Sequence, residues 1–374
     1  MSSWPSVHTQ HWLQALSRRG HEVHFILPPA KSPTFEGIPE KVILHEFSWQ
    51  SPVKGTGALA LALELRDKLR RIKPDIFHVH SVFAVGNWKL FSWVAAMCTF
   101  HPLVLTAWGG DLLNTPQASR AGRLFVRFAV RSADLITADS LSLLEAAHEL
   151  GAPRERLHEV QFGVDTESFR QNVETGSLRS DLDLGSGPIV YSPRAFMPVY
   201  NQTRIVEAVP AVLRVFPDCK FIFKRRSDHH SPANEEDVRR KIEELNIAAA
   251  VRFVPDISQE KLPALYALSD VVISVPDFDG TPRSVLEAMA CGAYPVVSDL
   301  PALREWITCP ENGLFVPSIE PKLIAAALIE ALSSPETLKA AQPRNRQIIE
   351  TRASSAHWVG KMEALYGTLL SSGK

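Results

Sequence analysis

Two acidic residues eight positions apart frame the stretch of the chain best suited to bind a ligand. Asp279 lies in a turn rich in glycine and proline, and Glu287 lies on a helix expected over 284–290. The apolar run 271–273 before the turn and the run 294–297 after the helix are typical of buried strands. Such a strand, turn, helix and strand form one α/β unit, and in an open parallel sheet its turn lies at the ligand-binding edge.

The backbone of this turn supplies groups that complement the two acids. The amides of Gly280 and Thr281 are expected near the helix N-terminus, where unpaired N–H groups and the helix dipole favour an anion. Carboxylates beside a phosphate are repulsive unless they accept hydrogen bonds from hydroxyl groups of the same ligand. A nucleotide sugar carries such hydroxyls on its ribose and its hexose. In the structural alternative, Asp279 caps the helix and Glu287 is solvated.

The composition is that of an ordinary globular protein. Of the 374 residues 45% are hydrophobic and 22% charged, and the length suits two domains. A formal charge of −1 argues against a nucleic-acid partner held by general phosphate attraction. The cysteines show no Cys-x-x-Cys spacing, so we expect no zinc site and a reduced, cytoplasmic setting. No apolar run reaches the roughly 18–20 residues of a membrane span, but peripheral contact with the inner membrane face is left open.

Strands and helices alternate along two stretches of the chain, as in parallel sheets wound by right-handed crossovers. In the first stretch we expect strands at 21–27, 42–47, 75–79, 103–107, 135–138 and 157–161, and helices at 9–19, 58–71, 88–98, 119–131 and 142–149. In the second we expect strands at 189–191, 219–223, 251–254, 271–273, 294–297 and 313–316, and helices at 203–215, 235–245, 261–268, 284–290, 321–332 and 356–370.

The pattern predicts an α/β fold of two doubly wound parallel-sheet domains that face a cleft. The segment 163–187 is rich in Gly, Ser and Asp, which is typical of a linker. We therefore place the first domain at 1–168 and the second at 185–350. The last helix, 356–370, is expected to pack back on the first domain, because the second sheet leaves it nothing to cover.

The start of the chain departs from this pattern. An α/β domain normally opens with a strand that lies centrally in the sheet, whereas here the helix at 9–19 comes first. We therefore expect that a strand-length segment is missing upstream. The alternative is a sheet that closes without that strand. An in-frame stop codon directly before Met1 would favour the alternative.

Two further patterns carry weaker functional hypotheses. Gly55 and Gly57, with Asp75 about twenty residues on, fit a loose dinucleotide fingerprint, which would indicate a nicotinamide dehydrogenase. That mechanism needs the first glycine directly after a strand, and seven residues intervene here, so a loop and helix start is the preferred interpretation. His229 and His230 lie in a polar loop without a third ligand at metal spacing, and we expect no metal site there.

The run from Asp279 to Gly292, D-G-T-P-R-S-V-L-E-A-M-A-C-G, resembles the Glu-x7-Glu signature of the retaining glycosyltransferase family 4. Members of that family have the GT-B fold of two Rossmann-like domains. The segments 18–26, 73–80 and 162–169 resemble other landmarks of the family, so the likeness covers nearly the whole chain. Asp279 is a departure, because the family usually has Glu there; the carboxylate is kept with a shorter reach.

The resemblance implies a role for each group of the turn. Glu287 would accept hydrogen bonds from the ribose hydroxyls of the donor, and Asp279 would contact the transferred sugar. The amides of Gly280 and Thr281 would lie near the phosphates.

A diphosphate leaving group also needs positive charge, because negative charge grows on it as the glycosidic bond breaks. Arg194 matches the family's arginine, but Val199 stands where the family usually has a lysine. Lys224, with Arg225 and Arg226, is a candidate to supply the missing charge; a solvated basic loop is the alternative for the two arginines.

In the first domain the loop Trp108-Gly109-Gly110-Asp111 is the acceptor-side candidate. The family often has a histidine where Trp108 stands. Gly109 and Gly110 let the backbone approach a ligand closely, and Asp111 is expected to hold a sugar hydroxyl unless it only caps the next segment. His80, at the carboxyl end of its strand, is a further acceptor-side candidate.

These residues predict a retaining, metal-independent glycosyltransferase without a cofactor. It would move a sugar from a nucleoside diphosphate, UDP or GDP, to an acceptor hydroxyl of a glycan, lipid or small molecule. No residue is placed as a covalent nucleophile, and the resemblance implies that the leaving phosphate assists deprotonation of the acceptor. The alternative is a glycosyltransferase-like protein that binds sugar nucleotides and has lost turnover, which Trp108 and Val199 favour.

Overall fold

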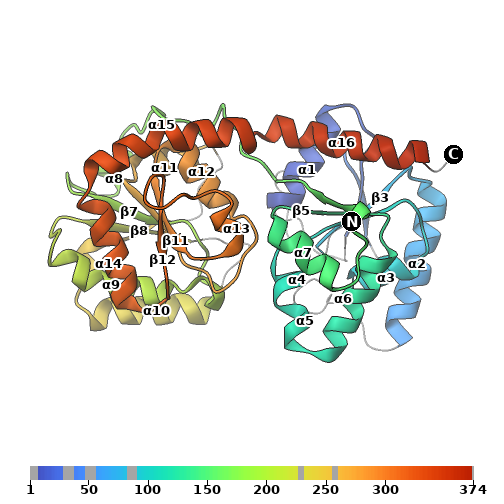
Figure 1. The fold of residues 1–374 in the computed structure, drawn as a ribbon, viewed down its shortest axis with the longest axis horizontal. Coiled ribbons are helices and arrows are strands. Elements are labelled where there is room, and N and C mark those ends of the chain that lie inside the picture. Colours follow the sequence, from blue (N-terminus) through green and yellow to red (C-terminus); the bar gives the residue numbers. More distant parts are fainter. Residues whose placement is uncertain are drawn as a thin grey trace. The chain divides into compact units, whose positions relative to one another are not determined.

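The computed structural model describes residues 7–27, 38–46, 56–81, 91–225, 231–254 and 260–372. Four of the residues named above lie outside these ranges: Gly55, Arg226, His229 and His230. The chain divides into two units, Met1–Phe162 with Ala356–Lys374, and Gly163–Ser355 (Figure 1). Within the described residues, no helix has both the length and the apolar character that crossing a bilayer requires.

The first unit is built on parallel strands that form two sheets. One pairs β1 (His24–Leu27) with β2 (Ile43–Glu46); the other has the order β3 (Phe77–His80), β4 (Leu103–Thr106), β5 (Leu135–Ala138), β6 (Leu157–Glu159). Its helices are α1 (Val7–Arg18), α2 (Thr56–Ile72), α3 (Phe91–Met97), α4 (Gly110–Leu113), α5 (Thr115–Ala118), α6 (Arg120–Ser132), α7 (Leu141–Glu149) and α16 (Ser355–Ser372). β4 and β5 are buried along their whole length, as expected for a parallel sheet covered on both faces.

Helices cover both faces of the four-stranded sheet. Side chains of α2, α3, α6 and α7 share one core with Phe77, Leu103 and Ile136 of the strands. On the other face a smaller cluster joins Trp12 of α1 to Trp358 and Met362 of α16. The helix expected at 356–370 thus packs within the first unit.

The expected central strand can be compared with the edges of the two sheets. Among the described residues β1 pairs only with β2, and β3 pairs on one side only, with β4. Ile26 of β1 nevertheless lies in the same core as Phe77 and Val79 of β3. A strand upstream of the chain remains a prediction.

The second unit holds a six-stranded parallel sheet in the order β12 (Leu314–Val316), β11 (Tyr294–Ser298), β10 (Val271–Ser274), β7 (Ile189–Ser192), β8 (Lys220–Lys224), β9 (Val251–Val254). Its helices are α8 (Leu178–Asp181), α9 (Gln202–Leu213), α10 (Pro232–Glu244), α11 (Leu262–Leu268), α12 (Arg283–Cys291), α13 (Pro301–Arg304), α14 (Pro321–Leu332) and α15 (Pro335–Arg352). One face is covered by α9, α10 and α14, the other by α8, α11, α12 and α15 (Figure 1).

The strand order reverses beside β7. From β7 the chain builds outward through β8 and β9, and then crosses to β10, β11 and β12 on the other side. The loops that leave β7 and β10 therefore diverge at the carboxyl edge of adjacent strands. This is the topological switch point at which open α/β sheets bind ligands.

Two segments differ from the sequence expectation. The segment 163–187 is no free linker, because Val164, Phe169 and Leu184 are buried in the core of the second unit. The 18-residue helix α15 was not expected. It has Pro343 inside it and buries few apolar side chains, so it lacks the period of an amphipathic helix. Its Asn345 instead exchanges two 3.0 Å hydrogen bonds with buried Asn312.

A polar ladder crosses the α16-facing side of the first sheet. The imidazole of His78 lies 2.6 Å from Tyr366 Oη of α16 and 2.6 Å from Thr106 Oγ1, which in turn lies 2.6 Å from Thr137 Oγ1. Burial lowers the pKa of His78 to about 3. His78 is therefore held neutral, as expected for a satisfied core histidine.

This neutral histidine gives the fold a predictable pH dependence. The unfolded chain takes up a proton near the ordinary histidine value of 6.5, whereas folded His78 does so only near 3. This histidine therefore costs no stability at pH values above 6.5. As the pH falls below 6.5, the free energy of unfolding decreases by up to about 1.4 kcal/mol per pH unit. Urea unfolding near pH 7 and pH 5 measures this slope. His78→Gln should flatten it, and an unchanged slope in that variant would contradict the assignment.

Candidate functional site

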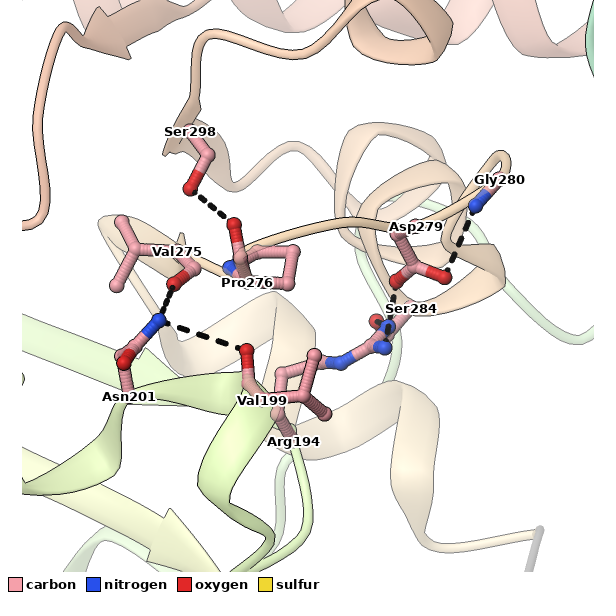
Figure 2. Close-up of polar contacts among 9 residues, drawn as sticks. All are labelled: Arg194, Val199, Asn201, Val275, Pro276, Asp279, Gly280, Ser284 and Ser298. Carbon is pink, nitrogen blue, oxygen red and sulfur yellow. Dashed lines mark hydrogen bonds and ion pairs between the residues drawn. The ribbon is translucent and has the colours of Figure 1, made fainter. Parts of the chain in front are cut away.

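The turn from β10 into α12 is fixed by contacts on both sides. Figure 2 shows Asn201 Nδ2 donating to Val275 O, at 2.9 Å, and Ser298 Oγ donating to Pro276 O, at 2.8 Å. The backbone amide of Asp277 also donates to Val199 O at 3.0 Å. At its other end α12 stops at Gly292, whose φ of +92° is the left-handed cap expected of a glycine. The turn is thus held in one conformation by the loop after β7 and by β11.

Arg194 and Asp279 meet at the switch point. Arg194 Nη2 lies 2.6 Å from Asp279 Oδ2, and Arg194 Nη1 donates to Ser284 Oγ at 3.3 Å (Figure 2). The guanidinium also lies 4.0 Å from the centre of the Tyr200 ring, a cation–π distance. The loops after the adjacent strands β7 and β10 thereby bring together two residues 85 positions apart in the sequence.

Burial disfavours the charged forms of Arg194 and Asp279, and the neighbouring groups offset this effect. Burial raises the pKa of Asp279, and the Arg194 guanidinium and the Gly280 amide offset part of that rise. Burial likewise opposes the charge on Arg194, but Asp279 and Tyr200 outweigh it, so the pKa of Arg194 is raised. A cation whose side chain is only 12% exposed, and which one carboxylate holds, is well suited to receive an anionic ligand.

The carboxylate of Asp279 does not cap α12. Its Oδ1 accepts from the Gly280 amide at 3.1 Å while Oδ2 takes Arg194, and the N-cap residue of α12, Pro282, has no side-chain cap bond. The helix N-terminus expected to favour an anion therefore lacks a side-chain cap. This geometry excludes the capping alternative for Asp279.

Glu287 is buried, with only 5% of its surface exposed. Its Oε2 accepts from Tyr266 Oη at 3.1 Å, and its Oε1 lies 2.9 Å from Arg283 Nε. Burial, and then Glu287, raise the pKa of the Tyr266 phenol far above its usual value, so the phenol stays a donor. Glu287 is thus fixed by two partners, which excludes the alternative of a solvated side chain.

Thr281 and Lys224 lie at the same carboxyl edge of the sheet. The Oγ1 of buried Thr281 accepts from Trp306 Nε1 at 3.3 Å. Lys224 is the last residue of β8, next to β7, and is buried. Its neighbour Arg225 forms a 3.1 Å ion pair with Glu235 of α10. We therefore assign Arg225 a structural role, holding α10 against the end of β8.

The loop after β4 in the first unit folds around Asp111. The carboxylate of Asp111 accepts from the amides of Trp108 at 3.1 Å, Gly109 at 2.9 Å and Leu112 at 3.1 Å, and Asp111 is 5% exposed. Gly109 has a φ of +120°, which requires a glycine. The carboxylate thus holds the loop before α4, whose N-cap residue has no side-chain cap bond; contact of Asp111 with a sugar hydroxyl remains a prediction.

Two polar groups beside this loop have no hydrogen-bond partner among the residues that the structure describes. They are His80 Nδ1 and Trp108 Nε1, both buried, and the two rings are 6.4 Å apart. Burial, and then neighbouring His78, lower the pKa of His80 well below its usual value, so its imidazole is neutral. Gln161 Oε1, after β6, is a third buried atom without a partner in the described part of the chain. Buried polar atoms are seldom left unpaired, so this edge is suited to receive a polar ligand.

The sequence analysis did not identify several residues of the site. Tyr200 and Tyr266 contact Arg194 and Glu287, and only the structure shows those contacts. Arg283 contacts Glu287 four positions on, a spacing on one helix that could have indicated the pair from the sequence. A tyrosine in an apolar helix such as α11 indicates core packing, and no local signal points to Glu287. Among the described residues no group of three or more His, Cys, Asp and Glu side chains is placed to hold a metal ion.

Comparisons with known proteins agree with this geometry. Residues 178–348 match the family model "Glycosyl transferases group 1", and residues 1–140 match "Glycosyl transferase 4-like". The chain is similar to N-acetyl-alpha-D-glucosaminyl L-malate synthase of Bacillus anthracis, with 23% identity over 96% of this chain and 92% of that protein. It is also similar to a GDP-mannose-dependent alpha-(1-6)-phosphatidylinositol monomannoside mannosyltransferase of Mycolicibacterium smegmatis, with 25% identity over 57% of this chain and 56% of that protein.

The fold is that of solved GT-B structures. Alr3699/HepE of Anabaena, crystallised with UDP and glucose, superposes with a TM-score of 0.80 at 18% identity, over 99% of this chain and 98% of that one. The two doubly wound units expected from the sequence are thereby confirmed.

Proposed function

The chain belongs to the group 1 glycosyltransferases of the family 4 type, and from this premise we propose that it transfers a sugar from a UDP- or GDP-linked donor to an acceptor hydroxyl with retention of configuration. Glycosyl transfer from a nucleoside diphosphate sugar is the activity of the family. Retention follows from the resemblance of 279–292 to the retaining signature. NMR of the anomeric proton in the first-formed product tests it, and an inverted product would contradict it.

The observation that carries the proposal is the pair of donors that hold Asp279. Arg194 Nη2 and the Gly280 amide, the two groups assigned to the diphosphate, both donate to the Asp279 carboxylate. The carboxylate thus lies where a phosphate oxygen of the donor would accept hydrogen bonds from the same two groups. We assign to the donor diphosphate the displacement of this carboxylate from Arg194, after which Asp279 is free to accept from a hydroxyl of the transferred sugar.

Charge stabilisation is assigned to Arg194, with Lys224 as the second cation, rather than to a metal ion. As the glycosidic bond breaks, the leaving diphosphate gains negative charge, which a guanidinium fixed by Tyr200 and Ser284 stabilises without reorganisation. The freed phosphate oxygen then accepts the proton of the acceptor hydroxyl. Glu287, fixed by Tyr266 and Arg283, is assigned to the ribose hydroxyls.

The acceptor is assigned to the first unit. The unpartnered atoms His80 Nδ1, Trp108 Nε1 and Gln161 Oε1 supply one donor, one acceptor and one group whose role depends on the tautomer. A neutral imidazole can accept a hydrogen bond from a hydroxyl, and the indole N–H can only donate. These groups suit an acceptor that carries hydroxyls, and Gly109 and Gly110 give it close access to the backbone.

Asp279→Asn provides the direct test. The amide no longer competes as an anion for Arg194, so affinity for UDP or GDP alone should rise by a few fold, while the transfer rate should fall about tenfold because the charged acceptor for the sugar hydroxyl is lost. Calorimetry with the nucleotide and a transfer assay measure the two effects. Parallel losses of nucleotide affinity and rate would contradict the displacement step. Nucleotide binding without turnover by the unaltered protein on any acceptor would favour the alternative of a binding protein.

A further inference from the structure

The outward side of α6 combines two kinds of side chain that rarely share a solvent-facing surface. The helix sequence, RAGRLFVRFAVRS, contains four arginines and no acidic residue. Six of its exposed side chains form what we call the α6 basic face: Arg120, Arg123, Leu124, Arg127, Phe128 and Arg131. At 3.6 residues per turn they fall within a stripe of roughly 140° around the helix. Leu124 and Phe128 have 67% and 44% of their surface exposed.

The opposite side of the helix is fully engaged, so this face cannot turn inward. Val126, Ala129 and Val130 are completely buried in the core of the first unit. The Phe125 ring packs edge-on against Trp93 of α3 at 5.1 Å. Ser119 Oγ caps the first turn by accepting from the Gly122 amide at 2.9 Å. The exposure of Leu124 and Phe128 is therefore a fixed property of the fold.

The charges of the face do not serve the helix itself. Arg120 and Arg123 lie in the first turn, where the helix dipole disfavours cations. Arg123, Arg127 and Arg131 follow one another at intervals of four, a spacing at which like charges repel. Across the described part of the chain none of the four arginines forms an ion pair with a carboxylate. A surface that lowers helix stability in this way is complementary to an external anion.

A second helix of the same unit shows that exposed leucines alone do not make such a surface. On α2, Leu59 and Leu63 are 55% and 57% exposed. The charged residues of α2 are mixed in sign, and two ion pairs join them, Lys68 with Glu64 and Arg71 with Asp67. Of these two helices, only α6 joins exposed apolar groups to positive charge with no acidic residue on the helix to offset it.

We propose that the α6 basic face binds the surface of an anionic lipid bilayer. The helix, about 20 Å long, would lie flat in the interface. Leu124 and Phe128 would enter the headgroup region, and the guanidinium groups would bind lipid phosphates in bidentate geometry. A nucleic acid would satisfy the arginines but leave Leu124 and Phe128 in water, so the alternation of charged and apolar groups favours lipid. The docking is independent of the proposed transfer reaction.

Co-sedimentation of the full chain with vesicles tests the proposal. Binding to vesicles that contain phosphatidylglycerol should be at least about tenfold tighter than to phosphatidylcholine alone and should weaken as salt rises. Arg123→Glu with Arg127→Glu, and separately Leu124→Ser with Phe128→Ser, should each reduce binding about tenfold or more. The matched control, Leu59→Ser with Leu63→Ser on α2, should bind as the unaltered protein does.

Three results would overturn the proposal. They are equal binding to both vesicle types, an equal loss in the α2 control, and binding to duplex DNA in the absence of vesicle binding. A thermal shift with UDP or GDP, measured on every variant, separates this test from that of the catalytic proposal. The shift should be unchanged in the α6 variants, which also shows that they fold.

Discussion

Replacing Arg194 with alanine is expected to lower the rate of sugar transfer by about two to three orders of magnitude, the usual loss when one fixed donor to a developing negative charge is removed. The structure places this guanidinium at the switch point, where Ser284, Tyr200 and Asp279 fix it. Its loss removes stabilisation that grows as the diphosphate leaves, so kcat should fall more than donor affinity.

The substitution also leaves the part-buried Asp279 carboxylate without its cation, which should lower stability by up to about 3 kcal/mol. The double variant Arg194→Ala with Asp279→Asn removes that unpaired charge. It should recover most of the thermal stability and none of the activity. Arg194→Lys keeps the charge but not the fork, and should recover part of the rate.

Arg252→Ala is the matched control for the Arg194 variants. Arg252 lies on β9 in the same unit, has a similarly enclosed side chain and holds the Leu182 carbonyl through its Nε at 2.9 Å. Its loss should destabilise the second unit without a large change in kcat. If Arg252→Ala lowered kcat as much as Arg194→Ala does, or if the double variant regained activity, the role assigned to Arg194 would be wrong.

The parts of the fold that the sequence predicts are those with strong local signals. The apolar runs of β10 and β11 and the glycine at 292 mark both ends of α12 without any long-range information. The helix α15 could not be predicted from the sequence, because few apolar side chains mark its buried face. One residue of that face is the polar Asn345, whose hydrogen-bond partner Asn312 is 33 positions away. The existence of α15 depends on tertiary contacts that periodicity cannot reveal.

In the candidate site, too, local signals predict some residues, whereas other contacts depend on the folded chain. Asp279 and Glu287 share one short stretch, so their spacing alone could be interpreted, whereas the contact of Asp279 with Arg194 depends on the order of β7 and β10 in the sheet. The sequence also left two roles possible for Asp111, because a carboxylate after two glycines can either accept from a sugar hydroxyl or cap a helix. The backbone amides that surround Asp111 become visible only once the loop is folded.

Glu287→Gln is expected to weaken binding of the donor nucleotide by about ten- to a hundredfold, because hydrogen bonds to a charged acceptor are worth about 1.5–3 kcal/mol. Glutamine keeps the shape of the side chain and can still accept from Tyr266. It loses the charge that pairs with Arg283 and that would receive the ribose hydroxyls. Calorimetry with UDP and GDP measures the loss.

Glu235→Gln is the matched control, because Glu235 is nearly as buried and has an arginine partner at the same spacing on α10, Arg239, as well as Arg225. Both variants lose a buried carboxylate that pairs with arginine, so both should lower the unfolding temperature. Only Glu287→Gln should weaken nucleotide binding. A comparable loss in both would show that destabilisation of the unit, rather than a direct contact, controls affinity.

A nucleotide without ribose hydroxyls completes the argument as a double-mutant cycle. If Glu287 accepts from those hydroxyls, the dideoxy analogue should bind the unaltered protein weakly, and Glu287→Gln should change its affinity little. The two losses are then one interaction removed from either side. If the variant weakens the analogue as much as it weakens UDP or GDP, Glu287 acts through Arg283 and Tyr266, the residues that it holds, and is a positioning residue of the donor site instead of a ligand to the ribose.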